Sequence, residues 1–363
     1  MTRMDATVTP LRVGLLGYGL AGSVFHAPLI ATTPGLALDT VVTSDPERQA
    51  QARTAGGPDS GGVRVAATAD ELFDRADELD LVVVATPNRS HVALARRALE
   101  AGLPVVVDKP LAATAAEAGE LAALADERRL LLSPFQNRRW DNDFRTLAAL
   151  LDEGALGEPH RFESRFERWR PKPKGGWRES GDPAEVGGLL YDLGSHLVDQ
   201  ALTLFGPAVS VYAESDVRRA GAEADDDSFV ALRHASGVRS HLWMSATAAQ
   251  LGPRFRVLGS AAAYVKYGLD PQEAALREGA RPARGMPWGV EPEFAWGALG
   301  ALDETRTVPT RDGAYPAYYD AIAVALREGT PPPVTAWEAT AALRVLEAAR
   351  TSARTGSTVS LPD

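Results

Sequence analysis

The segment Leu11-Arg-Val-Gly-Leu-Leu16 runs directly into Gly17-Tyr-Gly19-Leu-Ala-Gly22, and this junction decides how the first part of the chain folds. The apolar run predicts a buried strand, and the stretch Ser23–Ile30 predicts the helix that follows it. Three glycines at this spacing between a strand and a helix are typical of a dinucleotide-binding turn. A generic glycine-rich turn is the plainer alternative.

Each glycine of this turn has its own physical role in dinucleotide binding. Gly17 allows the tight bend, Gly19 lets the backbone approach a pyrophosphate, and Gly22 allows the helix to pack closely on the strand. The phosphates then lie at the positive end of the helix dipole. We therefore predict a cofactor site made by Gly17, Tyr18, Gly19, Leu20, Ala21 and Gly22.

Short apolar strands alternate with amphipathic helical stretches over residues 1–137. Strands separated by helices predict parallel βαβ units, and the uninterrupted run Leu81–Val84 suits a strand covered on both faces. We therefore expect an α/β protein whose N-terminal domain is a Rossmann-type, doubly wound parallel sheet. Its predicted strands are Leu11–Leu16, Leu36–Thr43, Val63–Ala66, Leu79–Ala85, Pro104–Val107 and Leu130–Ser133.

The periodicity changes after Asn137. One helix is predicted around Leu189–Phe205, and His234–Gly237 is typical of a hairpin turn. A last helix near 335–353 is expected to pack back on the first domain. We expect residues 138–363 to form an α+β domain with a large, mainly antiparallel sheet. Its predicted strands are Val209–Val217, Ser228–Arg233, Val238–Ser245, Arg254–Gly259 and Ala262–Tyr267.

The composition narrows the class of function. The chain has 363 residues with 45% hydrophobic and 24% charged side chains, which is ordinary for a globular protein. A net charge of −10 argues against nucleic acid, and the absence of cysteine excludes disulfides and thiolate metal ligands. The sequence shows no apolar run of membrane-spanning length, and Met1–Pro10 lacks the apolar core of a signal peptide. We expect a cytoplasmic protein that binds a small molecule and no metal.

The second strand ends in residues that bear on the choice between NAD and NADP. Asp45 could accept a hydrogen bond from a ribose 2′-hydroxyl and favour NAD, whereas Thr43, Ser44 and Arg48 could hold the 2′-phosphate of NADP. The plainer alternative is that Arg48 lies in an ordinary surface loop and binds no cofactor. We lean slightly to NADP and leave both cofactors open.

The fourth strand is followed by Thr86-Pro-Asn-Arg-Ser-His91, at the edge where a doubly wound sheet forms its crevice. We predict cofactor contacts here from Thr86, Pro87, Asn88 and His91. His91 is expected to be a surface residue that begins a helix, and not a catalyst.

Two segments carry candidate reacting groups. Lys109 ends the fifth predicted strand within Asp108-Lys109-Pro110 and therefore lies at the same sheet edge as the glycines, where both Asp108 and Lys109 can contact the cofactor. Asp192 and His196 are four residues apart, so a helix places them on one face. Histidine can take a hydroxyl proton near neutral pH, and Asp192 can orient that histidine or a neighbouring hydroxyl. Solvated surface charges and a half-buried structural histidine are the plainer alternatives.

These segments together resemble the glucose-fructose oxidoreductase/inositol dehydrogenase (Gfo/Idh/MocA) family over nearly the whole chain. The resemblance rests on the glycine turn with Val24-Phe-His26, on Asp108-Lys109-Pro110 and on Tyr191-Asp-Leu-Gly-Ser-His196. Further stretches are similar to the bacterial subgroup that includes NADP-dependent scyllo-inositol dehydrogenase: Asn137–Phe144, Tyr264–Gly268 and Tyr315–Tyr319.

The resemblance implies an NAD(P)-dependent dehydrogenase that moves a hydride between nicotinamide and a carbinol carbon of a sugar or cyclitol. It implies Lys109, Asp192 and His196 as catalytic residues, and a homodimer or homotetramer assembled through the C-terminal sheet. It also suggests substrate contacts from Arg168, Arg170, Trp177, Arg178 and Tyr267.

Two departures from the family pattern bear on these expectations. The usual Glu-Lys-Pro is Asp-Lys-Pro here, and Asp45 stands near a position where the inositol dehydrogenase relatives carry arginine. The second departure puts their NADP preference in question for this chain. A dinucleotide-binding sensor without turnover and a cofactor-assisted glycosidase on the same fold are the alternative functions.

Overall fold

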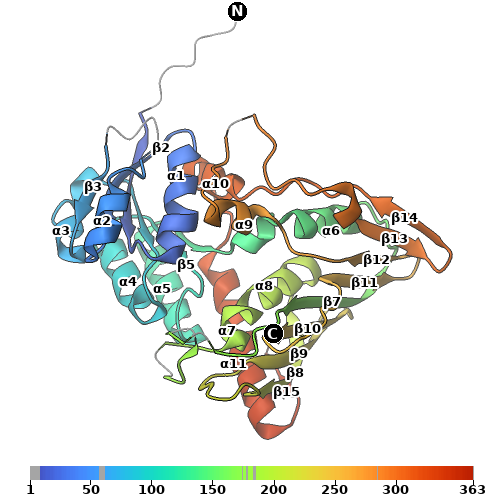
Figure 1. The fold of residues 1–363 in the computed structure, drawn as a ribbon. Helices are drawn as coiled ribbons and strands as arrows, with labels where there is room; N and C mark the ends of the chain where they lie inside the picture. Colours follow the sequence, from blue (N-terminus) through green and yellow to red (C-terminus); the bar gives the residue numbers. More distant parts are fainter. Residues whose placement is uncertain are drawn as a thin grey trace, which may run out of the picture.

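Two β-sheets with their helices stand side by side in the computed structural model (Figure 1). The structure describes residues 9–56, 62–173, 175–176, 179–182, 185–283 and 285–362. The first sheet is built from the first 135 residues, and the second sheet from residues 159–360.

The first sheet is wholly parallel and has the strand order β3-β2-β1-β4-β5-β6, which confirms the predicted Rossmann-type topology. The chain reverses direction across the sheet between β1 and β4, and the crevice at their carboxyl ends is where such sheets bind ligands. The strands are β1 (Leu11–Leu16), β2 (Leu36–Val42), β3 (Arg64–Ala66), β4 (Leu81–Val84), β5 (Val105–Asp108) and β6 (Leu132–Phe135).

Helices cover both faces of this sheet, as the continuously buried strands require. Thr114 begins the longest of them with a capping box, in which its hydroxyl accepts from the Glu117 amide and the Glu117 carboxylate accepts in return. These helices are α1 (Ala27–Thr32), α2 (Pro46–Ala52), α3 (Ala69–Phe73), α4 (His91–Glu100) and α5 (Ala115–Arg128).

The glycine turn leads from β1 into a short π-helical turn, η1 (Ala21–His26). Gly17 has a φ of +97°, and a Cβ there would lie 2.6 Å from the Ala85 carbonyl oxygen. A Cβ on Gly22 would lie 2.1 Å from the Gly17 carbonyl oxygen, so only glycine fits between helix and strand. Gly19 differs, because the nearest atom to its Cβ position would be 4.0 Å away, on Arg48. The turn is thus tight at its two ends and open in the middle.

The second sheet has nine strands in the order β14-β13-β12-β11-β7-β10-β9-β8-β15. Among the described strands of this second sheet only β7 and β10 pair in parallel, so the prediction of a large, mainly antiparallel sheet is confirmed. The strands are β7 (Pro159–Glu167), β8 (Ala208–Asp216), β9 (Asp227–His234), β10 (Arg239–Ser245), β11 (Phe255–Gly259), β12 (Ala263–Lys266), β13 (Gly297–Ala301), β14 (Glu304–Val308) and β15 (Val359–Ser360).

The expected single helix around Leu189–Phe205 is two helices, α7 (Leu189–Asp192) and α8 (Gly194–Phe205). The break falls at Leu193, and the His196 amide donates to the Leu193 carbonyl in a tightened turn. Gly194 packs so closely on the sheet that a Cβ there would lie 2.9 Å from the Met244 sulfur. Asp192 therefore ends one helix, while His196 lies in the next one.

The chain returns to the first sheet near its C-terminal end. Tyr315, Tyr318 and Tyr319 at the start of α10 (Pro316–Glu328) are fully buried in the core beneath that sheet. Their rings contact Phe25, Phe135 and His26 from the first 135 residues. The last helix, α11 (Ala336–Thr355), packs on α5 as well as on α8 and β8. The division of the sequence into 1–137 and 138–363 stays a prediction.

Short elements complete the connection between the sheets: η4 (Asn137–Trp140), α6 (Asn142–Asp152), α9 (Gln272–Arg277) and η6 (Glu293–Ala295). A search of the described residues finds no helix with the length and apolarity needed to cross a bilayer.

We predict that Gly22→Ala lowers the free energy of unfolding by about 1–3 kcal/mol, because the new methyl group forces helix and strand apart. Gly19→Ala is the matched control, and its methyl group enters open space. Denaturant unfolding followed by circular dichroism measures both variants. Equal stability of Gly22→Ala and the wild type would contradict the close packing described above.

Candidate active site

A cavity of about 710 Å³ lies where the carboxyl edge of the parallel sheet meets the second sheet. Six separated parts of the chain form its walls. Two of them are the junction of β6 with η4 and helix α9, and the other four are the glycine turn, the end of β5, the end of β7 with the segment after it, and helices α7 and α8. Predicted site residues from these last four parts line it: Leu20, Ala21, Asp108, Lys109, Arg168, Arg170, Asp192 and His196.

An ion pair joins the two sides of the cavity. The Lys109 ammonium lies 2.8 Å from the Asp192 carboxylate and donates a second hydrogen bond, of 2.6 Å, to the Asp192 carbonyl. Both side chains are largely shielded from solvent, with 16% and 24% of their surface exposed. Lys109 is therefore held at the end of β5 with its charge turned into the cavity.

Neighbouring groups fix both partners of this ion pair. The Asp108 carboxylate accepts from the Lys109 amide at 2.9 Å. Burial by itself would raise the pKa of Asp108, but His26, followed by Lys109, outweighs burial and holds that pKa below its ordinary value. On the other side, Asp225 accepts from the amide of Leu190 at 2.7 Å and so anchors α7, which carries Asp192.

His196 is buried beside the ion pair. Burial, followed by the positive charges of Lys109 and Arg138, holds the pKa of its imidazole well below the ordinary value, so the ring is neutral at neutral pH. Within the described residues no hydrogen bond joins His196 to Asp192, whose carboxylate binds Lys109. The structure thus shows Asp192 in contact with Lys109 and not with the histidine, and the orientation of a neighbouring hydroxyl by Asp192 stays a prediction.

Arg138 also lines the cavity, as a functional residue that was not predicted from the sequence. It forms an ion pair with Glu273 and donates to the Tyr315 hydroxyl at 2.8 Å. Burial disfavours its charge, but Tyr315, Asp141 and Glu273 outweigh this effect and hold the pKa of Arg138 well above its ordinary value. Arg138 therefore remains charged at the floor of the cavity.

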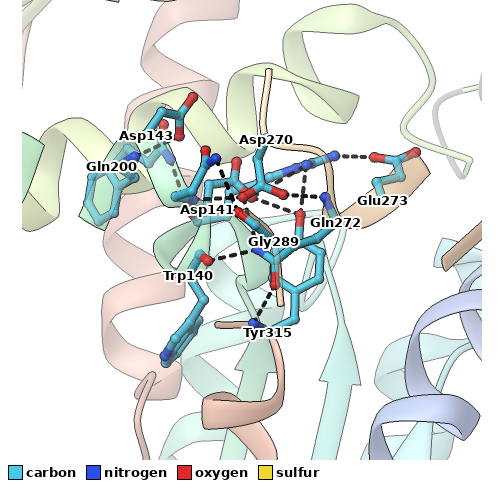
Figure 2. A network of polar contacts seen from close by, with 12 residues as sticks. Trp140, Asp141, Asp143, Gln200, Asp270, Gln272, Glu273, Gly289 and Tyr315 are labelled. Carbon is cyan, nitrogen blue, oxygen red and sulfur yellow. Dashed lines mark hydrogen bonds and ion pairs between the residues drawn. The ribbon is translucent and has the colours of Figure 1, made fainter. Parts of the chain in front are cut away.

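A buried polar network joins Asp141, Asp270, Gln272 and Tyr315 (Figure 2), and Arg138 is tied to it through its hydrogen bond to the Tyr315 hydroxyl. Asp270 accepts from the amides of Asn142 and Gln272, both at 2.7 Å, and its burial raises its pKa to about 6. Gln272 in turn accepts from the Tyr315 amide at 2.8 Å. The network thus ties η4 and α6 to the segment that precedes α9, so the position of Arg138 depends on both sheets.

Gln200 extends this network to α8, the helix that carries His196. It lies one turn beyond His196 on α8, donates to the Arg138 carbonyl at 2.9 Å and accepts from Arg254 at 2.8 Å. Arg254 is buried and forms an ion pair with Asp143 at 3.3 Å. Asp141, Asn142 and Asp143 are buried beside it, and their signal in the sequence is a run of polar residues at the start of a helix.

The end of β2 lies close to the open centre of the glycine turn. Asp45 caps α2, because its carboxylate accepts from the amides of Glu47 at 2.9 Å and Arg48 at 3.2 Å. The Arg48 guanidinium lies 3.6 Å from the Asp45 carboxylate and extends to within 4.0 Å of the Cβ position of Gly19. Half of its side-chain surface is exposed, so Arg48 is accessible to a ligand there.

The remaining predicted cofactor residues lie around the same crevice. Tyr18 and Thr43 are buried, Ser44 is exposed, and Thr86 and Pro87 form the turn after β4. Asn88 donates to the Glu185 carbonyl at 3.1 Å. His91 begins α4 as expected, but it is buried and not on the surface, because its ring nitrogens contact the carbonyl oxygens of Thr86 and Pro110.

The predicted substrate residues are only partly brought together. Arg168 and Arg170 line the cavity. Tyr267 lies outside its lining and is 59% exposed at the end of β12. Trp177 and Arg178 lie outside the described residues. Among the residues that the structure describes, no group of three potential ligands could hold a metal ion.

Comparison with known proteins identifies the family of this chain. Residues 11–135 match the oxidoreductase family's NAD-binding Rossmann fold, and residues 148–361 match its C-terminal alpha/beta domain. The chain belongs to the Gfo/Idh/MocA oxidoreductase family. It is therefore an oxidoreductase with an NAD(P)-binding Rossmann fold.

Several family members are similar over their full length. The oxidoreductase YdgJ of Escherichia coli is 44% identical, covering 97% of this chain and 99% of YdgJ. The scyllo-inositol 2-dehydrogenase (NADP(+)) IolW of Bacillus subtilis is 37% identical, covering 98% of this chain and 97% of IolW. The solved structure of the Bacillus subtilis oxidoreductase yvaA has a TM-score of 0.90 at 35% identity, covering 99% of this chain and all of that one.

We predict that the His196 imidazole stays neutral while the pH falls through 6.5, because burial and nearby cations lower its pKa. Lys109→Gln should raise this pKa, since it removes one of those positive charges. A ¹⁵N NMR titration of the imidazoles, with the His196 signal assigned by its loss in His196→Gln, measures both values. A wild-type ring that is fully protonated at pH 6 would contradict the electrostatic analysis.

Proposed function

We propose that this oxidoreductase is an NAD(P)-dependent dehydrogenase that oxidises a secondary alcohol of a cyclitol or sugar to the ketone. The observation that carries the proposal is the meeting of Lys109, Asp192 and His196 in one cavity beside the glycine turn. The full-length similarity to a protein named as an inositol dehydrogenase supports the same class of substrate.

The glycine turn fits a dinucleotide. Gly19 leaves open space, whereas Gly17 and Gly22 are packed too tightly for any side chain. Gly19 and the start of η1 would hold the pyrophosphate, with Leu20 and Ala21 at the cavity wall. The bound nicotinamide would supply the hydride acceptor for the reaction.

The proposed chemistry divides between two side chains. His196, neutral and buried, accepts the hydroxyl proton of the substrate while the hydride leaves the same carbon, so the alcohol loses two electrons and two hydrogens. Lys109 donates a hydrogen bond to the same oxygen and stabilises the negative charge that develops on it. Asp192 holds Lys109 in position through the 2.8 Å ion pair.

We favour NADP over NAD as the cofactor. Both oxygens of the Asp45 carboxylate already contact the start of α2 or Arg48, while the Arg48 guanidinium lies beside Gly19 and is half exposed. A guanidinium there suits a 2′-phosphate. The NADP dependence in the name of IolW supports the same choice.

We also propose that the enzyme works in the cytoplasm as a homodimer or homotetramer assembled through the second sheet. The helices α8 and α11 pack on one face of that sheet. Its other face carries the contacting rings of Phe229, His241 and Trp243 on β9 and β10, which are partly exposed and available to a second copy.

We predict that Lys109→Ala and His196→Ala each lower kcat by about 10²–10⁴, or roughly 3–5 kcal/mol of barrier, with little change in cofactor affinity. Because both residues act in one transition state, the double variant should be less impaired than the product of the single effects. Formation of reduced nicotinamide with a panel of inositols and sugars measures this. If a variant keeps more than about a tenth of wild-type kcat, the replaced residue does not have the proposed role.

We predict that Arg48→Ala weakens NADP binding by about 1.5–3 kcal/mol and leaves NAD binding nearly unchanged, since only NADP offers a 2′-phosphate for a charge-assisted hydrogen bond. Titration calorimetry with both cofactors measures the difference. Arg53→Ala, on the residue just after α2, is the matched control. Equal losses for the two cofactors would exclude Arg48 as the phosphate ligand.

A further inference from the structure

Two arginines in the cavity, Arg168 and Arg170, are contacted by no carboxylate in the described part of the chain. Arg168 and Arg170 follow β7 and alternate with Trp169, so that they and Phe166 all line the cavity. Neither side chain forms a hydrogen bond or an ion pair with the described residues. Neither guanidinium is completely shielded from solvent, so a ligand can reach both.

The other charged side chains of the cavity differ in this respect, because each has a partner. Lys109 pairs with Asp192, while Arg138 and Arg277 both pair with Glu273. The two remaining carboxylates are also engaged: Glu179 pairs with Arg219 at 3.0 Å, and Asp108 accepts from the Lys109 amide. The lining therefore carries five cations against four carboxylates, and Arg168 and Arg170 are the two cations that no described carboxylate contacts.

Arg168 is placed where an unbalanced charge is costly. Its side chain is partly buried, and burial, followed by the nearby positive charge of Arg170, lowers its pKa. A shielded cation without a contacting carboxylate is unfavourable unless a ligand brings the opposite charge.

The phosphates of the cofactor do not account for Arg168. Their proposed place is the glycine turn, whereas Arg168 is one of the cations whose charge acts on His196. Asp192 and Glu273, both in the catalytic part of the cavity, also act on Arg168 electrostatically. Arg168 therefore belongs to the reacting end of the cavity, where the substrate binds.

We infer that the substrate is an anionic polyol, a sugar or cyclitol carrying a carboxylate or a phosphate, whose oxyanion is bound by Arg168 with help from Arg170. The inference rests on the proposed function and narrows its substrate class. The planar fork of a guanidinium matches two oxygens of either anion, and the hydroxyls of a neutral sugar offer no compensating charge. Lys109 and His196 remain free for the carbinol that reacts.

The test compares matched neutral and anionic probes with NADP⁺ and with NAD⁺. One set is D-glucose, D-glucuronate and D-glucose 6-phosphate, and the second is myo-inositol and its 1-phosphate. We expect kcat/KM to be at least about 10-fold higher for an anionic member than for the neutral member of its set. The carboxylate and phosphate arms identify which oxyanion is used.

Variants assign this preference to Arg168. Arg168→Gln should lower kcat/KM for the anionic probe about 10- to 100-fold more than for the neutral probe, mainly through KM. Arg168→Lys, which keeps the charge, should recover part of the loss. Arg256→Gln is the control, because Arg256 pairs with Glu163 on the same sheet outside the cavity lining.

A neutral probe that is oxidised as efficiently as its anionic partners would overturn the inference while supporting the proposed function. Equal effects of Arg168→Gln on neutral and anionic probes would overturn it too. If no probe is oxidised, the proposed function fails. In that case, calorimetry measures the binding of D-glucuronate and D-glucose 6-phosphate to the enzyme–NADP⁺ complex. Binding that is lost in Arg168→Gln supports the inference, and no binding, or binding that does not depend on Arg168, overturns it.

Discussion

The ion pair between Lys109 and Asp192 joins residues 83 positions apart in the sequence and links the two halves of the molecule at the cavity. Lys109 comes from the edge of the parallel sheet, and Asp192 comes from a one-turn helix that packs on the second sheet. Because each charge is mostly shielded, losing either partner would leave the other without compensation. The relative position of the sheets, and with it the distance from His196 to the cofactor crevice, depends on this contact.

Behind the ion pair, the protein buries many polar groups where apolar packing would be simpler. Asp141, Asp143, Asp270, Arg138 and Arg254 share a network in which the positive and negative charges are interleaved. Such a network contributes less to stability than to a single defined geometry. Its effect here is to fix Arg138 and, through Gln200, the helix that carries His196.

The sequence was sufficient for the parallel sheet, because its strands are continuously apolar and its glycine turn has a known spacing. It was insufficient for β7, where Phe162 and Phe166 are the only large apolar residues between charged ones. The pairing of Arg138 with Glu273 could not be predicted either, since 135 positions separate them and no local pattern links the two. The family resemblance suggested Arg168 as a substrate contact. The sequence could not show that no described carboxylate contacts Arg168, because the groups around it come from distant parts of the chain.

The burial of the tyrosines of α10 beneath the first sheet has a consequence for how the chain is made. Phe135, which ends the parallel sheet, leaves the ribosome well before Tyr315, Tyr318 and Tyr319, which complete its core. At roughly 5–20 residues per second the delay is on the order of ten seconds or more. During translation the nascent Rossmann sheet therefore presents an apolar face that chaperones can bind, and it cannot be exchanged between proteins as an independent module without its distant helix.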